Sequence, residues 1–122
     1  MKDYRELIVW QRAMQLGTEI YRLTMELPKD ERFVLSDQLR RACVSVPSNI
    51  AEGYGRESRN DYVRFLKMAR GSLYEVETQL YLCRSIGYLS SKQTKAAFVL
   101  CTEVGKMLTA TIHSLISGRE YS

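Results

Sequence analysis

Proline, histidine and paired cysteines are scarce or missing in this 122-residue sequence, and long apolar runs are absent. The two prolines, Pro28 and Pro47, favour long helices over many short strands. The three cysteines, Cys43, Cys83 and Cys101, include no Cys-x-x-Cys pair, so neither a zinc site nor a redox motif is indicated. Isolated thiols are typical of a reducing cytoplasm, where we expect the protein to act.

No stretch approaches the roughly 18 uncharged apolar residues of a membrane span, so we expect no membrane partner. The N-terminal segment also lacks the apolar block of a signal peptide. His113 is the only histidine, and no metal ligands are spaced around it. Neither a catalytic triad nor the Glu-x-x-His pairs of a di-iron bundle occur. We therefore predict no enzymatic activity, no catalytic residues, no metal and no cofactor.

The composition is that of an ordinary globular protein, with 45% hydrophobic and 26% charged residues. This length predicts one domain over residues 1–122 with a sizeable core. The net charge is +4, and residues 38–70 carry all of it. That segment has three acidic residues, Glu52, Glu57 and Asp61, and seven basic ones. Clustered positive charge of this kind can attract RNA or DNA.

Apolar residues at alternating spacings of three and four predict four helices, over about residues 4–27, 30–54, 58–87 and 90–118. The last helix should bury Ala97, Cys101, Val104, Leu108, Thr111 and Leu115. Short connections make successive helices antiparallel neighbours, so the predicted fold is all-α, an up-and-down four-helix bundle. Ser58 and Ser90 are expected to cap the third and fourth helices. Gly71, inside the third helix, should permit a close backbone approach.

Two features of the first pair of helices depart from a simple bundle. Residues 4–27 carry a second apolar line beside the first, which makes their apolar surface wider than one neighbouring helix would cover. Its members are Leu7, Trp10, Met14, Gly17 and Tyr21. Pro47 lies inside the second helix and removes a backbone hydrogen bond, so we expect a kink or a break there.

Several stretches, taken in order, resemble a known family. They are Tyr4-x-x-Leu7-x-Val9-Trp10-Gln11-x-Ala13, Gln38-Leu39-Arg40-Arg41-Ala42, Asn49-Ile50-Ala51-Glu52-Gly53-x-Gly55-Arg56 and Phe65-Leu66-x-x-Ala69-x-Gly71-Ser72-Leu73-x-Glu75. The sequence is similar over nearly its whole length to the bacterial four-helix-bundle proteins encoded in intervening sequences of 23S rRNA genes. That family includes the accessory variability determinants of diversity-generating retroelements.

The resemblance implies an up-and-down bundle that assembles into a ring-like homo-oligomer, with a pentamer suspected. It also implies nucleic acid, or a nucleic-acid enzyme such as a reverse transcriptase, as a candidate partner. Most members of the family have no established biochemical function, so the resemblance supports the fold more firmly than any activity.

The basic residues of the second and third helices are the main candidate site. The predicted nucleic-acid-binding residues are Arg40, Arg41, Arg56, Arg59, Arg64, Lys67 and Arg70. Arginine can hold two phosphate oxygens at once. The alternative is that some of these side chains pair with nearby acids and that others are merely solvated. Our first hypothesis is a non-enzymatic homo-oligomer that binds RNA or DNA, and the second is a protein–protein scaffold or adaptor without a nucleic-acid role.

Asn49 falls on the core-facing side of the second helix, and Glu52 lies one turn further on. We interpret both as a structural polar network that sets helix register rather than as catalytic groups. Tyr74, Tyr81 and Tyr88 repeat every seven residues. Aromatic side chains beside cations can stack on bases, but this line lies away from the main basic cluster. Packing between helices or subunits is therefore the preferred interpretation.

Overall fold

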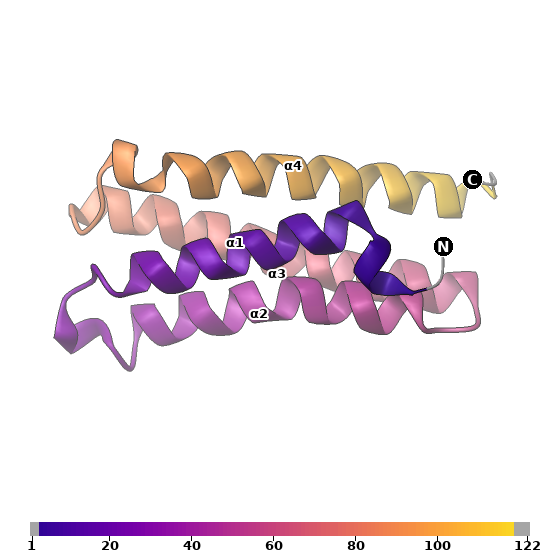
Figure 1. Ribbon diagram of the computed structural model, residues 1–122, viewed down its shortest axis with the longest axis horizontal. Coiled ribbons are helices and arrows are strands. Elements are labelled where there is room, and N and C mark those ends of the chain that lie inside the picture. Colours follow the sequence, from indigo (N-terminus) through magenta and orange to yellow (C-terminus); the bar gives the residue numbers. More distant parts are fainter. Residues whose placement is uncertain (1–2, 119–122) are drawn as a thin grey trace.

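The computed structural model describes residues 3–118, which form four long helices and contain no strand (Figure 1). The helices are α1 (Ile8–Thr24), α2 (Leu35–Tyr54), α3 (Arg59–Ile86) and α4 (Ser91–Ile116), with short 3-10 helices η1 (Tyr4–Glu6) before α1 and η2 (Lys29–Glu31) before α2. The predicted all-α four-helix bundle is confirmed. Within residues 3–118, each helix is too short or too polar to cross a bilayer.

The four helices form a square in which each packs against two neighbours. α1 contacts α2 and α4, and α3 contacts the same two helices. Successive helices run in opposite directions along the long axis, and the α2–α3 connection lies at the same end as both chain termini (Figure 1). The α1/α2 face and the α3/α4 face are consequently on opposite sides of the bundle.

One continuous core fills the centre of this square. Its largest fully buried side chains include Leu16, Ile20, Leu39, Ile50, Leu66, Leu73, Leu80, Leu108 and Ile112. The expectation for α4 was wrong at one position, because Ile112 is buried where Thr111 was predicted. The two residues are adjacent on the helix, and the larger apolar side chain takes the inward position while the Thr111 hydroxyl donates to the Met107 carbonyl.

The first two helices begin later than their apolar patterns predict. Asp3 caps the short η1 turn by accepting from the Arg5 amide, and Leu7 is extended before α1 starts. Val34 has a non-helical backbone and separates η2 from α2. The predicted caps of the other helices are present, since Ser58 accepts from the Asp61 amide. A full capping box joins Ser90 and Gln93 at the start of α4.

α2 passes through Pro47 as one uninterrupted helix, so the predicted break is wrong. Proline removes one donor from the helix ladder, and the remaining bonds and the burial of the Pro47 ring hold the helix together. The predicted kink stays a prediction.

α2 approaches α3 closely at Gly53. A Cβ atom at Gly53 would lie 2.7 Å from Cβ of Phe65 and 3.0 Å from Cδ1 of Tyr62. Gly71 has no such role, because an added Cβ would meet nothing within 4 Å. The expectation of a close approach at Gly71 is therefore wrong, since that residue faces solvent.

Gly53→Ala should lower the free energy of unfolding by about 1–3 kcal/mol, because the added methyl group overpacks the α2/α3 contact. Gly71→Ala is the matched control and should raise the same quantity by up to about 1 kcal/mol through helix propensity alone. Urea unfolding followed by circular dichroism measures both. Equal effects of the two substitutions would contradict the assigned contact.

Candidate nucleic-acid interface

Two of the seven predicted basic residues lie against one aromatic ring near the α2–α3 connection. The guanidinium carbons of Arg56 and Arg64 lie 4.7 Å and 4.6 Å from the centroid of Phe65. Arg56 pairs with Glu52 at 3.5 Å, and Arg64 pairs with Asp61 at 3.6 Å. The sequence places these two arginines eight residues apart. The turn between the helices, together with the aromatic ring, brings them to one place.

Arg59 and Lys67 add unpaired positive charge at this end of the bundle. Arg59 is the first residue of α3, and Lys67 lies about two turns further along it. Both side chains are exposed, and within residues 3–118 neither has a carboxylate partner within ion-pair distance. We call Arg56, Arg59, Arg64 and Lys67 the basic end.

Arg40 and Arg70 are instead held between helices. Nε of Arg40 donates to Oγ1 of Thr24 at 2.9 Å, and its guanidinium lies 5.1 Å from the Tyr21 ring, so Arg40 joins α2 to α1. Nη1 of Arg70 donates to Oγ1 of Thr109 at 3.3 Å, which joins α3 to α4. The two arginines thus point toward opposite faces of the bundle.

Arg41 is exposed but stands apart from the basic end. Its Nε donates to Asp37 at 2.8 Å, on the same helix. The hydroxyl contact between Ser45 and Ser72 shows that these two residues are level with each other, which puts Arg41 level with about Val76. That level is roughly 18 Å along α3 from Arg64, since each helical residue rises about 1.5 Å. The structure therefore divides the predicted set of seven: four residues gather at one end and three lie elsewhere.

The second predicted set, Asn49 and Glu52, is also divided. Nδ2 of Asn49 donates to the Ser45 carbonyl at 2.8 Å and to Ser45 Oγ at 2.9 Å, and Ser72 Oγ donates to Ser45 Oγ at 2.8 Å. This chain of polar groups crosses the α2/α3 interface. Glu52 takes no part in it, because its exposed carboxylate pairs with Arg56. The contact between Ser45 and Ser72 could not be predicted from the sequence, because isolated serines carry no pattern.

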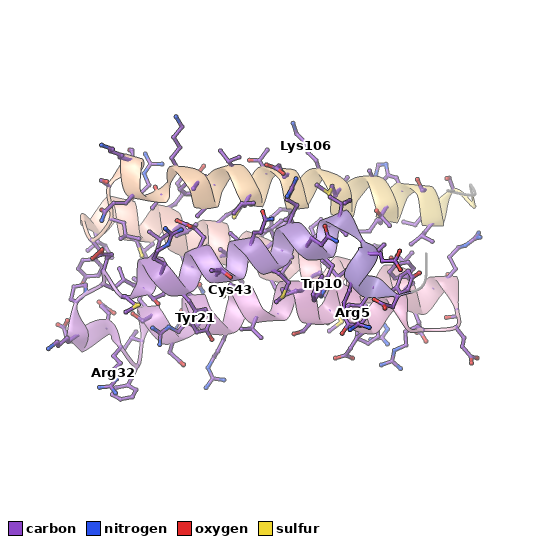
Figure 2. All side chains as sticks on the ribbon, viewed as in Figure 1. Arg5, Trp10, Tyr21, Arg32, Cys43 and Lys106 are labelled. Atoms are coloured by element: carbon purple, nitrogen blue, oxygen red, sulfur yellow. The ribbon has the colours of Figure 1, made fainter. Side chains whose placement is uncertain are left out.

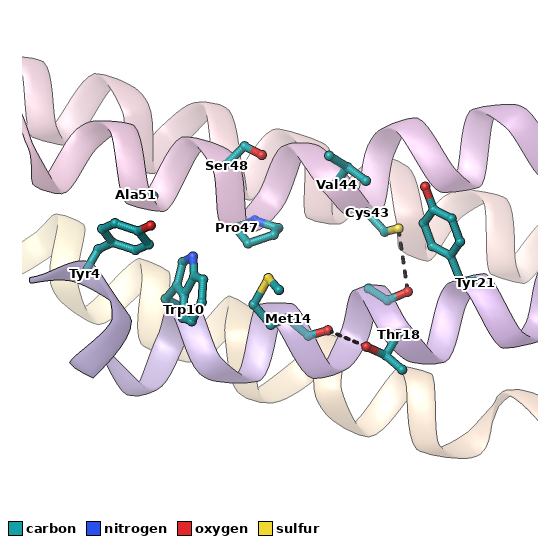
Figure 3. Close-up of a pocket in the computed structure, with 11 residues that line it drawn as sticks. Tyr4, Trp10, Met14, Thr18, Tyr21, Cys43, Val44, Pro47, Ser48 and Ala51 are labelled. Carbon is teal, nitrogen blue, oxygen red and sulfur yellow. Dashed lines mark hydrogen bonds between the residues drawn. The ribbon is translucent and has the colours of Figure 1, made fainter.

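A groove of about 620 Å³ runs along the α1/α2 face. Figure 3 shows Tyr4, Trp10 and Met14 on one side, facing Ala51 and Pro47 on the other. The second apolar line predicted for the first helix supplies one wall, with four of its five members lining the groove: Trp10, Met14, Gly17 and Tyr21. The groove has free space beside Gly17, because a Cβ atom added there would meet nothing within 4 Å.

The three cysteines are free thiols, and all three are buried. Burial raises the pKa of Cys43 and of Cys83 to about 11 and that of Cys101 to about 12, so all three are protonated at neutral pH. Figure 2 shows Cys43 between α1 and α2. Among residues 3–118, no three potential metal ligands of the His, Cys, Asp and Glu types come together.

The family model of the 23S rRNA-intervening sequence protein matches residues 5–110. The chain belongs to this family. The predicted family is thus confirmed, and its link to the accessory determinants of retroelements stays a prediction.

A solved structure supports the fold of this family member. It is a protein of unknown function from the S23 ribosomal protein family of Bacteroides thetaiotaomicron VPI-5482. The two chains are 27% identical and superpose with a TM-score of 0.80, covering 86% of this chain and 98% of the other. The curated proteins contain no match to this family member.

Ser45→Ala should lower the free energy of unfolding of this family member by about 1–2 kcal/mol. The substitution removes the hydroxyl that accepts hydrogen bonds from the half-buried amide of Asn49 and from the hydroxyl of Ser72. Ser48→Ala, on the exposed side of the same helix, should change it by less than about 0.5 kcal/mol. Thermal or urea unfolding of the two variants measures the difference. A loss at Ser48 as large as that at Ser45 would contradict a network across α2 and α3.

Proposed function

We propose that this protein is a non-enzymatic, homo-oligomeric accessory protein that binds RNA or DNA through its basic end. The observation that carries the proposal is the gathering of four cations at the α2–α3 connection, two of which are free of carboxylate partners among the described residues. The family name, which refers to intervening sequences in 23S rRNA, supports nucleic acid as the partner class.

The ion pairs at the basic end do not prevent phosphate binding. Arg64 and Arg56 are 57% and 46% exposed, and both pairs are longer than 3.4 Å. Exposed pairs of this kind contribute only about 0–1 kcal/mol. A phosphate can therefore displace the carboxylate and accept two hydrogen bonds from one guanidinium. Phe65 holds both guanidiniums beside its ring before any ligand binds, which lowers the side-chain entropy lost on binding.

Neutralising Arg64 and Lys67 together, as Arg64→Gln with Lys67→Gln, should weaken binding to a structured RNA by about tenfold or more at low salt. Each lost phosphate contact should also reduce the slope of log affinity against log salt by about one. Fluorescence anisotropy at several salt concentrations measures both quantities. The matched control is Lys29→Gln with Arg32→Gln, which removes the same charge at the opposite end of the bundle.

Two outcomes would contradict this part of the proposal. One is that the wild-type protein fails to bind nucleic acid even at low salt, which would favour a protein–protein scaffold or adaptor. The other is that the control pair weakens binding as much as Arg64 and Lys67 do, which would indicate a diffuse effect of net charge. A reverse transcriptase or another nucleic-acid enzyme is the protein partner that we propose, acting in the cytoplasm beside the bound nucleic acid.

We propose that self-association uses the groove on the α1/α2 face. Met14 and Tyr21 are 45% exposed and Val44 is 48% exposed, all on the same apolar surface. Apolar surface of this kind commonly marks a protein interface. The family resemblance suggests a ring, with five copies as the suspected number.

Val44→Glu should convert the oligomer to a monomer, because it places a charge inside an apolar interface. Leu82→Glu is the matched control, since Leu82 on α3 is also 48% exposed but lies outside the groove. Light scattering coupled to size exclusion measures the mass of each variant. A wild-type protein that is monomeric at micromolar concentration would rule out the assembly.

A further inference from the structure

A second hollow, of about 550 Å³, lies between α3 and α4 and is built around two aromatic rings. The ring centroids of Tyr81 and Phe98 are 4.6 Å apart and the rings are tilted by 41°. The guanidinium carbon of Arg84 lies 5.9 Å from Tyr81 and 5.7 Å from Phe98. Nη2 of Arg84 also donates to Oγ of Ser91 at 2.8 Å. The hydrogen bond and the two ring contacts hold the arginine and the aromatic pair in one arrangement.

Tyr81 is the solvent-exposed member of this aromatic pair, and Phe98 is partly buried against the core. Tyr81 is 56% exposed, although it packs on Phe98. The packing expected for the tyrosine line therefore covers only part of the Tyr81 side chain. Tyr88, the next residue in that line, differs because its hydroxyl donates to Glu31 at 2.8 Å.

The charge around the hollow is positive. Lys95 lines it, is exposed, and has no carboxylate partner within residues 3–118. Glu103 is the acidic side chain in the lining, and it pairs with Arg12 of α1 at 3.1 Å. An aromatic surface beside cations, with its acid already neutralised, suits a ligand that has both flat rings and negative charge.

Lys67 of the basic end and Tyr81 of the hollow lie on the same side of α3, with Glu77 midway between Arg70 and Arg84 along that helix. Lys67, Tyr74 and Tyr81 are seven residues apart and so lie on one line of α3. Arg70 contacts Thr109, and Arg84 contacts Ser91, so both arginines face α4. They are fourteen residues apart, which is about 21 Å along the helix. A nucleic-acid strand that is bound at the basic end and runs along the α3/α4 face would reach the aromatic pair after a few nucleotides.

We propose that Tyr81 and Phe98 form a stacking platform for unpaired bases, and that Lys95 contacts the phosphates of the same strand. The inference rests on the proposed function and adds to it the class of nucleic acid, which is single-stranded. The reason is that bases inside a duplex are already stacked on both faces, whereas an unpaired base can stack on an exposed ring.

The test compares two single strands of equal length by fluorescence anisotropy, an oligouridine and an abasic strand that keeps the phosphates but has no bases. Tyr81→Leu should weaken binding of the oligouridine about tenfold, the loss expected for stacking of one base, and leave the abasic strand unchanged. Tyr81→Phe keeps the ring and should bind as the wild type does. Phe33→Leu is the control, because Phe33 is an exposed aromatic outside the lining of the hollow.

Lys95→Gln provides a second, independent measurement. It should lower the affinity for the oligouridine and for the abasic strand to a similar extent, because both strands carry phosphates. The inference is overturned if the wild type binds the oligouridine and Tyr81→Leu binds it equally well. It is also overturned if Tyr81→Leu lowers the affinity for the oligouridine and for the abasic strand equally. In both cases the basic end can still be the binding site. If the wild type binds neither strand nor a structured RNA, the proposed function fails together with the inference.

Discussion

The bundle depends on removing four apolar helix faces from water at the same time. No single helix can do this, because each face needs two neighbours to cover it. Burial of leucine and isoleucine side chains supplies the main stabilisation, and close packing sets how near the helices approach. At Gly53 the backbone of α2 comes so close to α3 that a methyl group would not fit. The rest of the surface is arranged around that fixed core.

The square arrangement separates two different surfaces. The α1/α2 groove is apolar, while the α3/α4 face carries an aromatic pair flanked by cations. Because the two lie on opposite sides of the bundle, self-association through the groove would leave the α3/α4 face open to a nucleic-acid strand. In a ring, the basic ends of several copies would also be repeated, which strengthens binding without new contacts.

The positive charge of the chain acts through position more than through amount. Arg40 and Arg70 are used to join helices, whereas Arg59 and Lys67 face solvent without a carboxylate partner in the described part of the chain. Those two hydrogen bonds direct Arg40 toward α1 and Arg70 toward α4, on opposite faces of the bundle. This placement explains why the seven basic residues do not make one interface.

The sequence by itself determined the four helices, the caps of α3 and α4 and most of the core, because the spacing of apolar residues and the capping side chains act over one or two turns. It also identified the family through Asn49–Arg56 and the neighbouring stretches. Only the tertiary structure decided which arginines gather around Phe65, that Ser45 and Ser72 join α2 to α3, and that Tyr81 meets Phe98. These contacts join residues on different helices, and their geometry depends on helix register, which no local pattern records.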